Sequence, residues 1–158
     1  MRRLTDYENL SETSLLLIYE LVKETKNIQE LLHLKVYSRL RNCYQIHKYN
    51  EKIVEKIIDV FFFLVSHNEN IKDMLKLNYL MIMVESINSE KKTICIKGCK
   101  VLNEISKFVQ SHDKLFKIDI VKIMLIIIST SKEFKLLETA CQLITNLSCN
   151  SKYLHKLV

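Results

Sequence analysis

An internal repeat constrains the fold of this chain more than any other feature of its sequence. Residues 14–22, 98–106 and 140–148 share one pattern, in which a small residue is followed by aliphatic residues three, four and seven positions later. A fourth copy at 57–65 keeps the aliphatic spacing and is shifted by one residue. The copies start at 14, 57, 98 and 140, so they lie 41 to 43 residues apart. Such a period is typical of similar structural units that stack on one another.

Two further segments recur in the same order between these copies. Apolar residues at i, i+3, i+4 and i+7 within them predict amphipathic helices with one buried stripe each. The first segment occurs at 27–32, 70–75 and 153–158, and the second at 35–44, 78–87 and 118–128. A complete middle unit is therefore predicted to hold a short helix at about 68–76, a second at about 79–88 and a longer third at about 92–109, with corners at 66–68, 88–90 and 129–131.

Composition favours the same all-α fold class. The chain has 158 residues, no proline and a single glycine, Gly98. Folds rich in strands and tight turns use glycine for positive φ angles and proline for turns. A chain with almost neither is best explained by helices joined through short polar corners.

Three helices per unit, and a third helix that reads small-x-x-Leu-x-x-Asn-Leu-Ser, resemble the armadillo repeat. Residues 138–150 match that pattern best, and the resemblance covers nearly the whole chain. It implies an all-α, right-handed superhelical solenoid that forms a single domain over residues 1–158. The expected repeats are 1–25 (partial), 26–66, 67–109, 110–150 and 151–158 (partial).

Armadillo repeats usually carry a glycine between the first and second helices. Lys35, Asn78 and Asp119 stand at the corresponding positions of this chain. Asn and Asp tolerate the left-handed backbone conformation better than other non-glycine residues do. We therefore expect left-handed corners to be accommodated at Asn78 and Asp119.

The resemblance also implies a concave groove lined by the third helices. In peptide-binding armadillo proteins, a Trp and an Asn four residues later form a ladder there, and the Asn clamps the main chain of the partner. The matching pairs here are Leu16/Glu20, Asp59/Phe63, Lys100/Glu104 and Gln142/Asn146. Only Asn146 fits the pattern, and the chain has no tryptophan. Recognition of basic nuclear-localisation peptides is therefore not favoured, whereas Asn146 is the residue expected to hold a partner.

Other residues of the predicted groove suggest the kind of partner. Lys97, Lys100, Glu104 and Lys107 recur at helical spacing and form either a solvated helix face or a mildly basic surface for an acidic or mixed-charge segment. Phe62 and Phe63 cannot both point into the core, because Phe61 and Leu64 take the core positions. One of them is expected to meet the next repeat and the other to lie on the groove floor, with packing under the N-terminal helix as an equal alternative. Asp59, at the ladder position of the same helix, is a further candidate groove residue.

The net charge of +6 is uneven along the chain. Residues 1–79 carry 12 basic and 11 acidic groups, while residues 80–158 carry 12 and 7. The basic excess of the second half contains no arginine, which disfavours nucleic-acid recognition without excluding it.

No pattern of residues indicates catalysis, a metal site or a cofactor. The five cysteines have no framework spacing, and Cys95, Cys99 and the aligned Cys141 are interpreted as core-adjacent packing residues. The five histidines are scattered over expected corners and polar faces. No glycine-rich phosphate loop or secretory signal is recognisable, so an intracellular, cytoplasmic or nuclear location is expected.

These observations favour a non-enzymatic protein-interaction module. The alternatives are a structural subunit that assembles through its ends and convex face, a basic nucleic-acid binder, and a compact helical bundle. Leu154, Leu157 and Val158 begin a further repeat, which would leave the layer of Leu143 and Leu147 uncovered. We therefore expect that face to be covered by more chain, a partner or a second copy.

The repeat generates a prediction about shape. Because each repeat contacts only its neighbours, the particle should be elongated and wholly helical. Small-angle scattering with circular dichroism checks this, and a spherical particle would favour the bundle.

Overall fold

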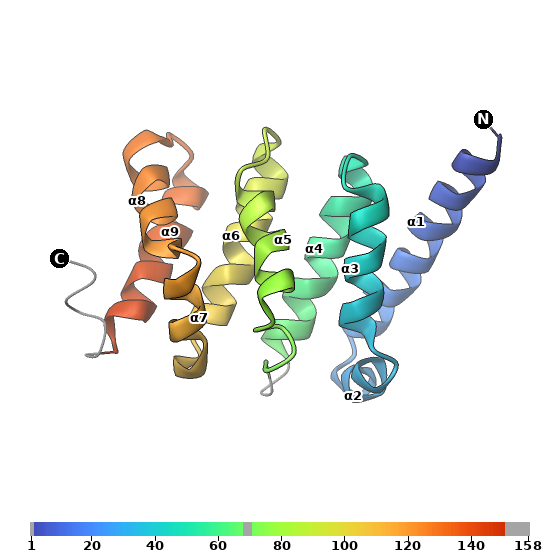
Figure 1. Cartoon of the computed structure of the whole chain (residues 1–158), viewed down its shortest axis with the longest axis horizontal. Helices are drawn as coiled ribbons and strands as arrows, with labels where there is room; N and C mark the ends of the chain where they lie inside the picture. The colour runs from blue at the N-terminus through green and yellow to red at the C-terminus, as the bar shows by residue number, and fades with distance from the viewer. Residues whose placement is uncertain (1, 68–70, 151–158) are drawn as a thin grey trace. The chain divides into compact units, whose positions relative to one another are not determined.

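The computed structural model describes residues 2–67 and 71–150, and divides into two compact units, 1–74 and 75–158. Within the described residues all regular structure is helical (Figure 1). Unit 1 contains α1 (Arg2–Val22), α2 (Thr25–His33), α3 (Val36–His47) and α4 (Glu51–Ser66). Unit 2 contains α5 (Leu77–Ile87), α6 (Lys92–Ser106), a 3-10 turn (Val109–Ser111), α7 (His112–Lys117), α8 (Ile120–Thr130) and α9 (Phe134–Ser148).

In both units, the third helix of a repeat is the helix around which the layer packs. In unit 1, α4 packs against α1 and α3, and its Ile53, Ile57 and Leu64 are fully buried. Asn50 starts α4, because its side-chain oxygen accepts a hydrogen bond from the Ile53 amide at 3.3 Å. In unit 2, α6 packs against α5 and α9, and α9 also packs against α8.

The single glycine permits a close crossing of α5 and α6. A Cβ atom at Gly98 would lie 3.0 Å from the Cβ of Ser86 and 3.2 Å from the carbonyl oxygen of Met83. The small residue of the repeat pattern thus faces the second helix of its own repeat. Ala140, the equivalent residue of α9, is fully buried.

The helix boundaries agree with the sequence except in the first segment of the middle repeat. A helix is predicted at about 68–76, but residues 71–75 form turns, and 68–70 lie outside the described residues. The second and third helices of that repeat are α5 and α6, and α6 ends at Ser106, earlier than expected. The predicted corners at 88–90 and 129–131 coincide with the ends of α5 and α8.

The left-handed corners are only partly where the sequence placed them. Asp119 is left-handed, with φ 53° and ψ 35°, as expected. The second left-handed residue is Lys35, with φ 57° and ψ 42°. Asn78 was wrongly assigned to a corner: it lies inside α5, and the extended residue Lys76, with φ −65° and ψ 133°, leads into that helix. The turns at 71–75 enter α5 by a different path, which removes the need for a left-handed residue.

The expectation that Leu143 and Leu147 are uncovered was wrong. Both side chains are fully buried within unit 2. The outer face of α9 instead exposes Cys141, although its repeat equivalent Cys99 is fully buried. The interpretation of Cys141 as a core-adjacent residue was therefore also wrong, because no described helix follows α9 to cover it. Leu154, Leu157 and Val158 lie outside the described residues.

No helix in the described part of the chain is both long and apolar enough to cross a membrane.

The left-handed corner at Lys35 leads to a stability prediction. A left-handed conformation costs an L-residue about 1–2 kcal/mol, and the extra backbone entropy that glycine loses offsets about half of that. Lys35→Gly should therefore raise the free energy of unfolding by about 0.5–1 kcal/mol in chemical denaturation. Asn78→Gly is the matched control and should lower it by a few tenths, since Asn78 is helical. Equal losses in both variants would contradict this account.

Candidate partner-binding surface

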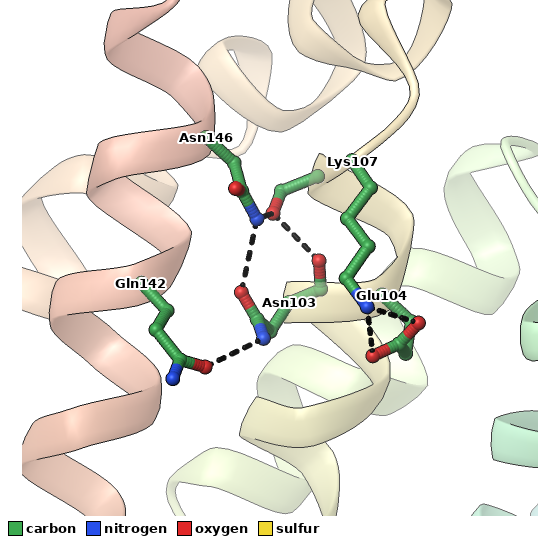
Figure 2. Close-up of polar contacts among 6 residues, drawn as sticks. Asn103, Glu104, Lys107, Gln142 and Asn146 are labelled. Carbon is green, nitrogen blue, oxygen red and sulfur yellow. Dashed lines mark hydrogen bonds and ion pairs between the residues drawn. The ribbon is translucent and has the colours of Figure 1, made fainter.

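A network of side-chain amides joins α6 to α9 in unit 2 (Figure 2). Asn103 stands at its centre and is 8% exposed. Its Nδ2 donates to Oε1 of Gln142 at 3.2 Å, and its Oδ1 accepts from Nδ2 of Asn146 at 3.1 Å. Nδ2 of Asn146 also donates to Oγ of Ser106 at 2.9 Å. One amide of α6 is thus held by two amides that lie one turn apart on α9.

The network has a buried hydroxyl at its base. Ser106 is fully buried, and its Oγ donates to the carbonyl oxygen of Asn103 at 2.7 Å while it accepts from Asn146. A buried polar group is tolerated when it has partners and is costly when it loses one. The network therefore fixes the register of α9 on α6.

The outward side of the network presents one donor and one acceptor. Both N–H groups of Asn146 are engaged, by Asn103 and by Ser106, which leaves Oδ1 of Asn146 as an acceptor. Gln142 uses its Oε1 for Asn103, which leaves its Nε2 as a donor. Gln142 is exposed and Asn146 is half-buried. The two residues are separated by one helical turn on α9.

The lysines predicted for this surface differ in their availability. Lys107 forms an ion pair with Glu104, and its Nζ lies 2.6 Å and 2.7 Å from the two carboxylate oxygens (Figure 2). Lys97 is half-buried and makes other interactions. Lys100 is exposed on α6. The surface is therefore less basic than the sequence pattern suggested.

The predicted residues of unit 1 form a separate cluster on α4 and α1. The ring of Phe63 meets Tyr19 of α1 edge to face, with ring centroids 5.6 Å apart. Nζ of Lys56 lies 4.1 Å from the centroid of Tyr19 and 3.9 Å from Oδ2 of Asp59. Phe63 thus packs under the N-terminal helix, one of the two positions expected for it. Phe62 is half-buried and contacts the Phe63 ring.

Two histidines assigned to corners and polar faces are buried instead. His112 is 1% exposed, and its Nε2 donates to the carbonyl oxygen of Ser106 at 2.8 Å. His47 is 9% exposed and shares a hydrogen bond of 3.0 Å with Ser11 Oγ of α1. Each ring ties its segment to a third helix, so both have a structural role that the sequence did not reveal.

The cysteines form no metal site in the described structure, which contains no cluster of three or more potential ligands. Cys95 and Cys99 are both buried on α6. The thiol of Cys99 donates a hydrogen bond to the Cys95 sulfur, which lowers the pKa of Cys95 and raises that of Cys99. Burial raises the pKa of the half-buried Cys43.

Sequence reasoning found Gln142 and Asn146 but missed Asn103 and Ser106. The ladder alignment takes only residues four positions apart on one face of each third helix. It therefore selected Glu104 and passed over its neighbour Asn103. The signal that could have indicated the network is the number of residues that separate its polar side chains along the sequence. Asn103 precedes Gln142 by 39 residues and Asn146 by 43, so each separation is within three residues of the 42-residue period.

The network leads to a prediction about stability. Asn103→Ala should lower the free energy of unfolding by about 1–3 kcal/mol, because the Asn146 amide and the Gln142 oxygen each lose a partner. Thr145→Ala is the control, since Thr145 is exposed and its side-chain hydroxyl donates to the Cys141 carbonyl oxygen within α9 at 2.9 Å. A double-mutant cycle with Asn146→Ala should give a coupling of at least about 0.5 kcal/mol. Additive losses would show that the contact contributes nothing.

Comparison with known proteins supports the fold. No protein-family model and no curated protein sequence matches this chain. Among solved structures, it is similar to a computationally designed armadillo repeat protein made for modular peptide recognition, with a TM-score of 0.84 and 14% identity. The match covers 95% of this chain and 63% of the designed chain, so this chain spans less than two thirds of its length. The chain has the fold of an armadillo-repeat solenoid.

Proposed function

We propose that this protein is a non-enzymatic interaction module that holds the main chain of a partner segment on the α6–α9 surface. The observation that carries the proposal is the pair of outward groups, Nε2 of Gln142 and Oδ1 of Asn146, which the amide network leaves available. A peptide unit needs one acceptor for its N–H and one donor for its carbonyl. The pair offers both a donor and an acceptor, and neither bond depends on the side chains of the partner.

The network also pre-organises this pair. Oε1 of Gln142 and Nδ2 of Asn146 are already bonded to α6, so neither side chain has to be ordered when a partner binds. Less side-chain entropy is then lost on binding. A scaffold of the same fold that was made for modular peptide recognition supports this use of the surface.

Charge suggests the composition of the segment. Lys100 is exposed on α6, three residues before Asn103, whereas Glu104 and Lys107 neutralise each other. One cation beside a neutral pair favours a segment of acidic or mixed charge. Nε2 and Oδ1 provide the binding energy, and Lys100 contributes mainly to the rate of association.

The variant Gln142→Glu distinguishes an effect on partner binding from an effect on folding. A carboxylate at this position still accepts the hydrogen bond from Asn103 but can no longer donate outward. Peptides selected by the intact chain from a display library of random linear sequences should bind the variant about 5–30-fold more weakly, a loss of about 1–2 kcal/mol. The thermal unfolding midpoint should not change.

Gln45→Glu is the matched control, because Gln45 is exposed on α3 and the substitution introduces the same charge. It should leave peptide affinity unchanged. Equal affinity of the parent chain and Gln142→Glu would contradict the proposal. A nucleic-acid binder would instead lose affinity steeply with salt for any removed lysine, with no special effect at Gln142.

A further inference from the structure

Two buried cysteines lie one turn apart near the start of α6, away from the surface proposed above. Cys95 is the fourth residue of α6 and Cys99 is the eighth. Cys95 is 8% exposed, whereas Cys99 is fully buried. Asn103, the centre of the amide network, follows Cys95 by eight residues, which is about 12 Å along a helix. The pair therefore belongs to a different part of unit 2 from the amide network.

The two thiols have different roles within the pair. Side chains of an α-helix lean towards its N-terminus, so the Cys99 side chain points back to the turn that carries Cys95. The thiol of Cys99 donates a hydrogen bond to the sulfur of Cys95. Such a bond stabilises a thiolate, so it lowers the pKa of Cys95 and raises the pKa of the donor, Cys99. Cys95 is therefore the thiol that ionises, and Cys99 is the one that stays protonated.

A hollow in unit 2 gives small molecules access to Cys95. It measures about 300 Å³ and is lined by residues of the α5–α6 corner, of the α8–α9 corner and of the helices that follow them. Cys95 of α6 and Leu136 of α9 are among its lining residues. A water molecule occupies about 30 Å³ in the liquid, so the hollow has room for a reactant of a few heavy atoms.

The charges around the hollow do not favour a charged reactant. Its lining includes two cations, Lys92 and Lys132, and two anions, Glu90 and Glu133. Opposite charges in equal number attract neither an anion nor a cation from solution. The hollow lies where α6 and α9 begin, and the N-terminal ends of helices favour an anion that forms in place, such as a thiolate. A small uncharged oxidant fits these conditions best.

We propose that Cys95 is a modification site that a small, uncharged peroxide oxidises to a sulfenic acid, with Cys99 as the positioning residue that donates a hydrogen bond to it. The Cys95 thiolate attacks one oxygen of hydrogen peroxide, and the S–O bond forms as the O–O bond breaks. The sulfur is oxidised by two electrons, which the peroxide accepts, and the leaving hydroxide takes up a proton to give water. The proposal does not depend on the main-chain recognition proposed above.

The helix keeps Cys99 from closing a disulfide on the oxidised sulfur. Residues four apart in an α-helix have Cα atoms about 6 Å apart and side chains that run parallel, whereas a disulfide needs Cβ atoms about 3.5–4.5 Å apart. The turn between the two cysteines contains Gly98, which packs closely against Ser86 of α5 and resists tightening. The sulfenic acid is therefore the expected product.

Trapping with dimedone, a reagent for sulfenic acids, tests the proposal on the full, reduced chain. Hydrogen peroxide is added near pH 7 in the presence of excess dimedone, and the adduct at each cysteine is followed by peptide mass spectrometry. Cys43 is the internal control, because it lines a hollow of about 290 Å³ in unit 1 but burial raises its pKa. Cys95 should react at least about tenfold faster than Cys43.

The variants Cys99→Ala and Cys99→Ser distinguish activation of Cys95 from packing around it. Alanine removes the hydrogen-bond donor, whereas serine keeps a donor of nearly the same size. Cys99→Ala should slow the oxidation of Cys95 by about threefold or more, and Cys99→Ser should stay within about twofold of the parent chain. The pH at which the rate at Cys95 rises should move upward in Cys99→Ala alone. Circular dichroism checks that both variants fold.

Three results overturn the proposal. Reaction at Cys95 no faster than at Cys43 shows that the hollow and the donor confer no reactivity, and this comparison decides by itself if Cys99→Ala does not fold. An equal or faster rate in folded Cys99→Ala shows that Cys99 only packs. A disulfide between Cys95 and Cys99, formed in place of the dimedone adduct, shows that Cys99 does not remain a reduced donor.

Discussion

Burial of one stripe on each third helix is the interaction on which the rest of this structure depends. On α4, α6 and α9 the stripe residues lose nearly all contact with water, at about 25 cal/mol for each Å² of apolar surface. Because the stripe faces the second helix of the same repeat, its burial sets the distance between those helices. The crossing at Gly98 is close, since a Cβ atom there would lie 3.0 Å from the Ser86 Cβ and would force the neighbouring helix to shift.

The polar network between α6 and α9 depends on that packing and adds what apolar contacts do not provide. Apolar surfaces can slide past one another at small cost, whereas hydrogen bonds require fixed geometry. The bonds from Asn103 to Gln142 and from Asn146 to Asn103 and Ser106 define one register of α9 on α6. The same bonds hold the outward amide atoms still, so the structural network and the proposed recognition surface share their residues.

The sequence by itself determined the helical class and most helix positions, because these depend on apolar periodicity within about ten to fifteen residues. The recurrence of the same pattern every 41 to 43 residues indicated stacked repeats, and the resemblance to the armadillo repeat implied the solenoid fold. It also selected Gln142 and Asn146 as candidates for partner binding from their place in the pattern, and that role stays a prediction. Only the tertiary structure decided which residues those amides bond. Asn103, Ser106 and His112 are buried by helices that lie far along the chain, and periodicity within one helix carries no information on such partners. It likewise decided that Lys35 takes the left-handed conformation while Asn78 lies within α5, because the path into α5 depends on the turns that precede it. Finally, Cys141 has the same repeat position as Cys99 and the opposite exposure, since burial depends on the presence of a neighbouring helix and not on the residue itself.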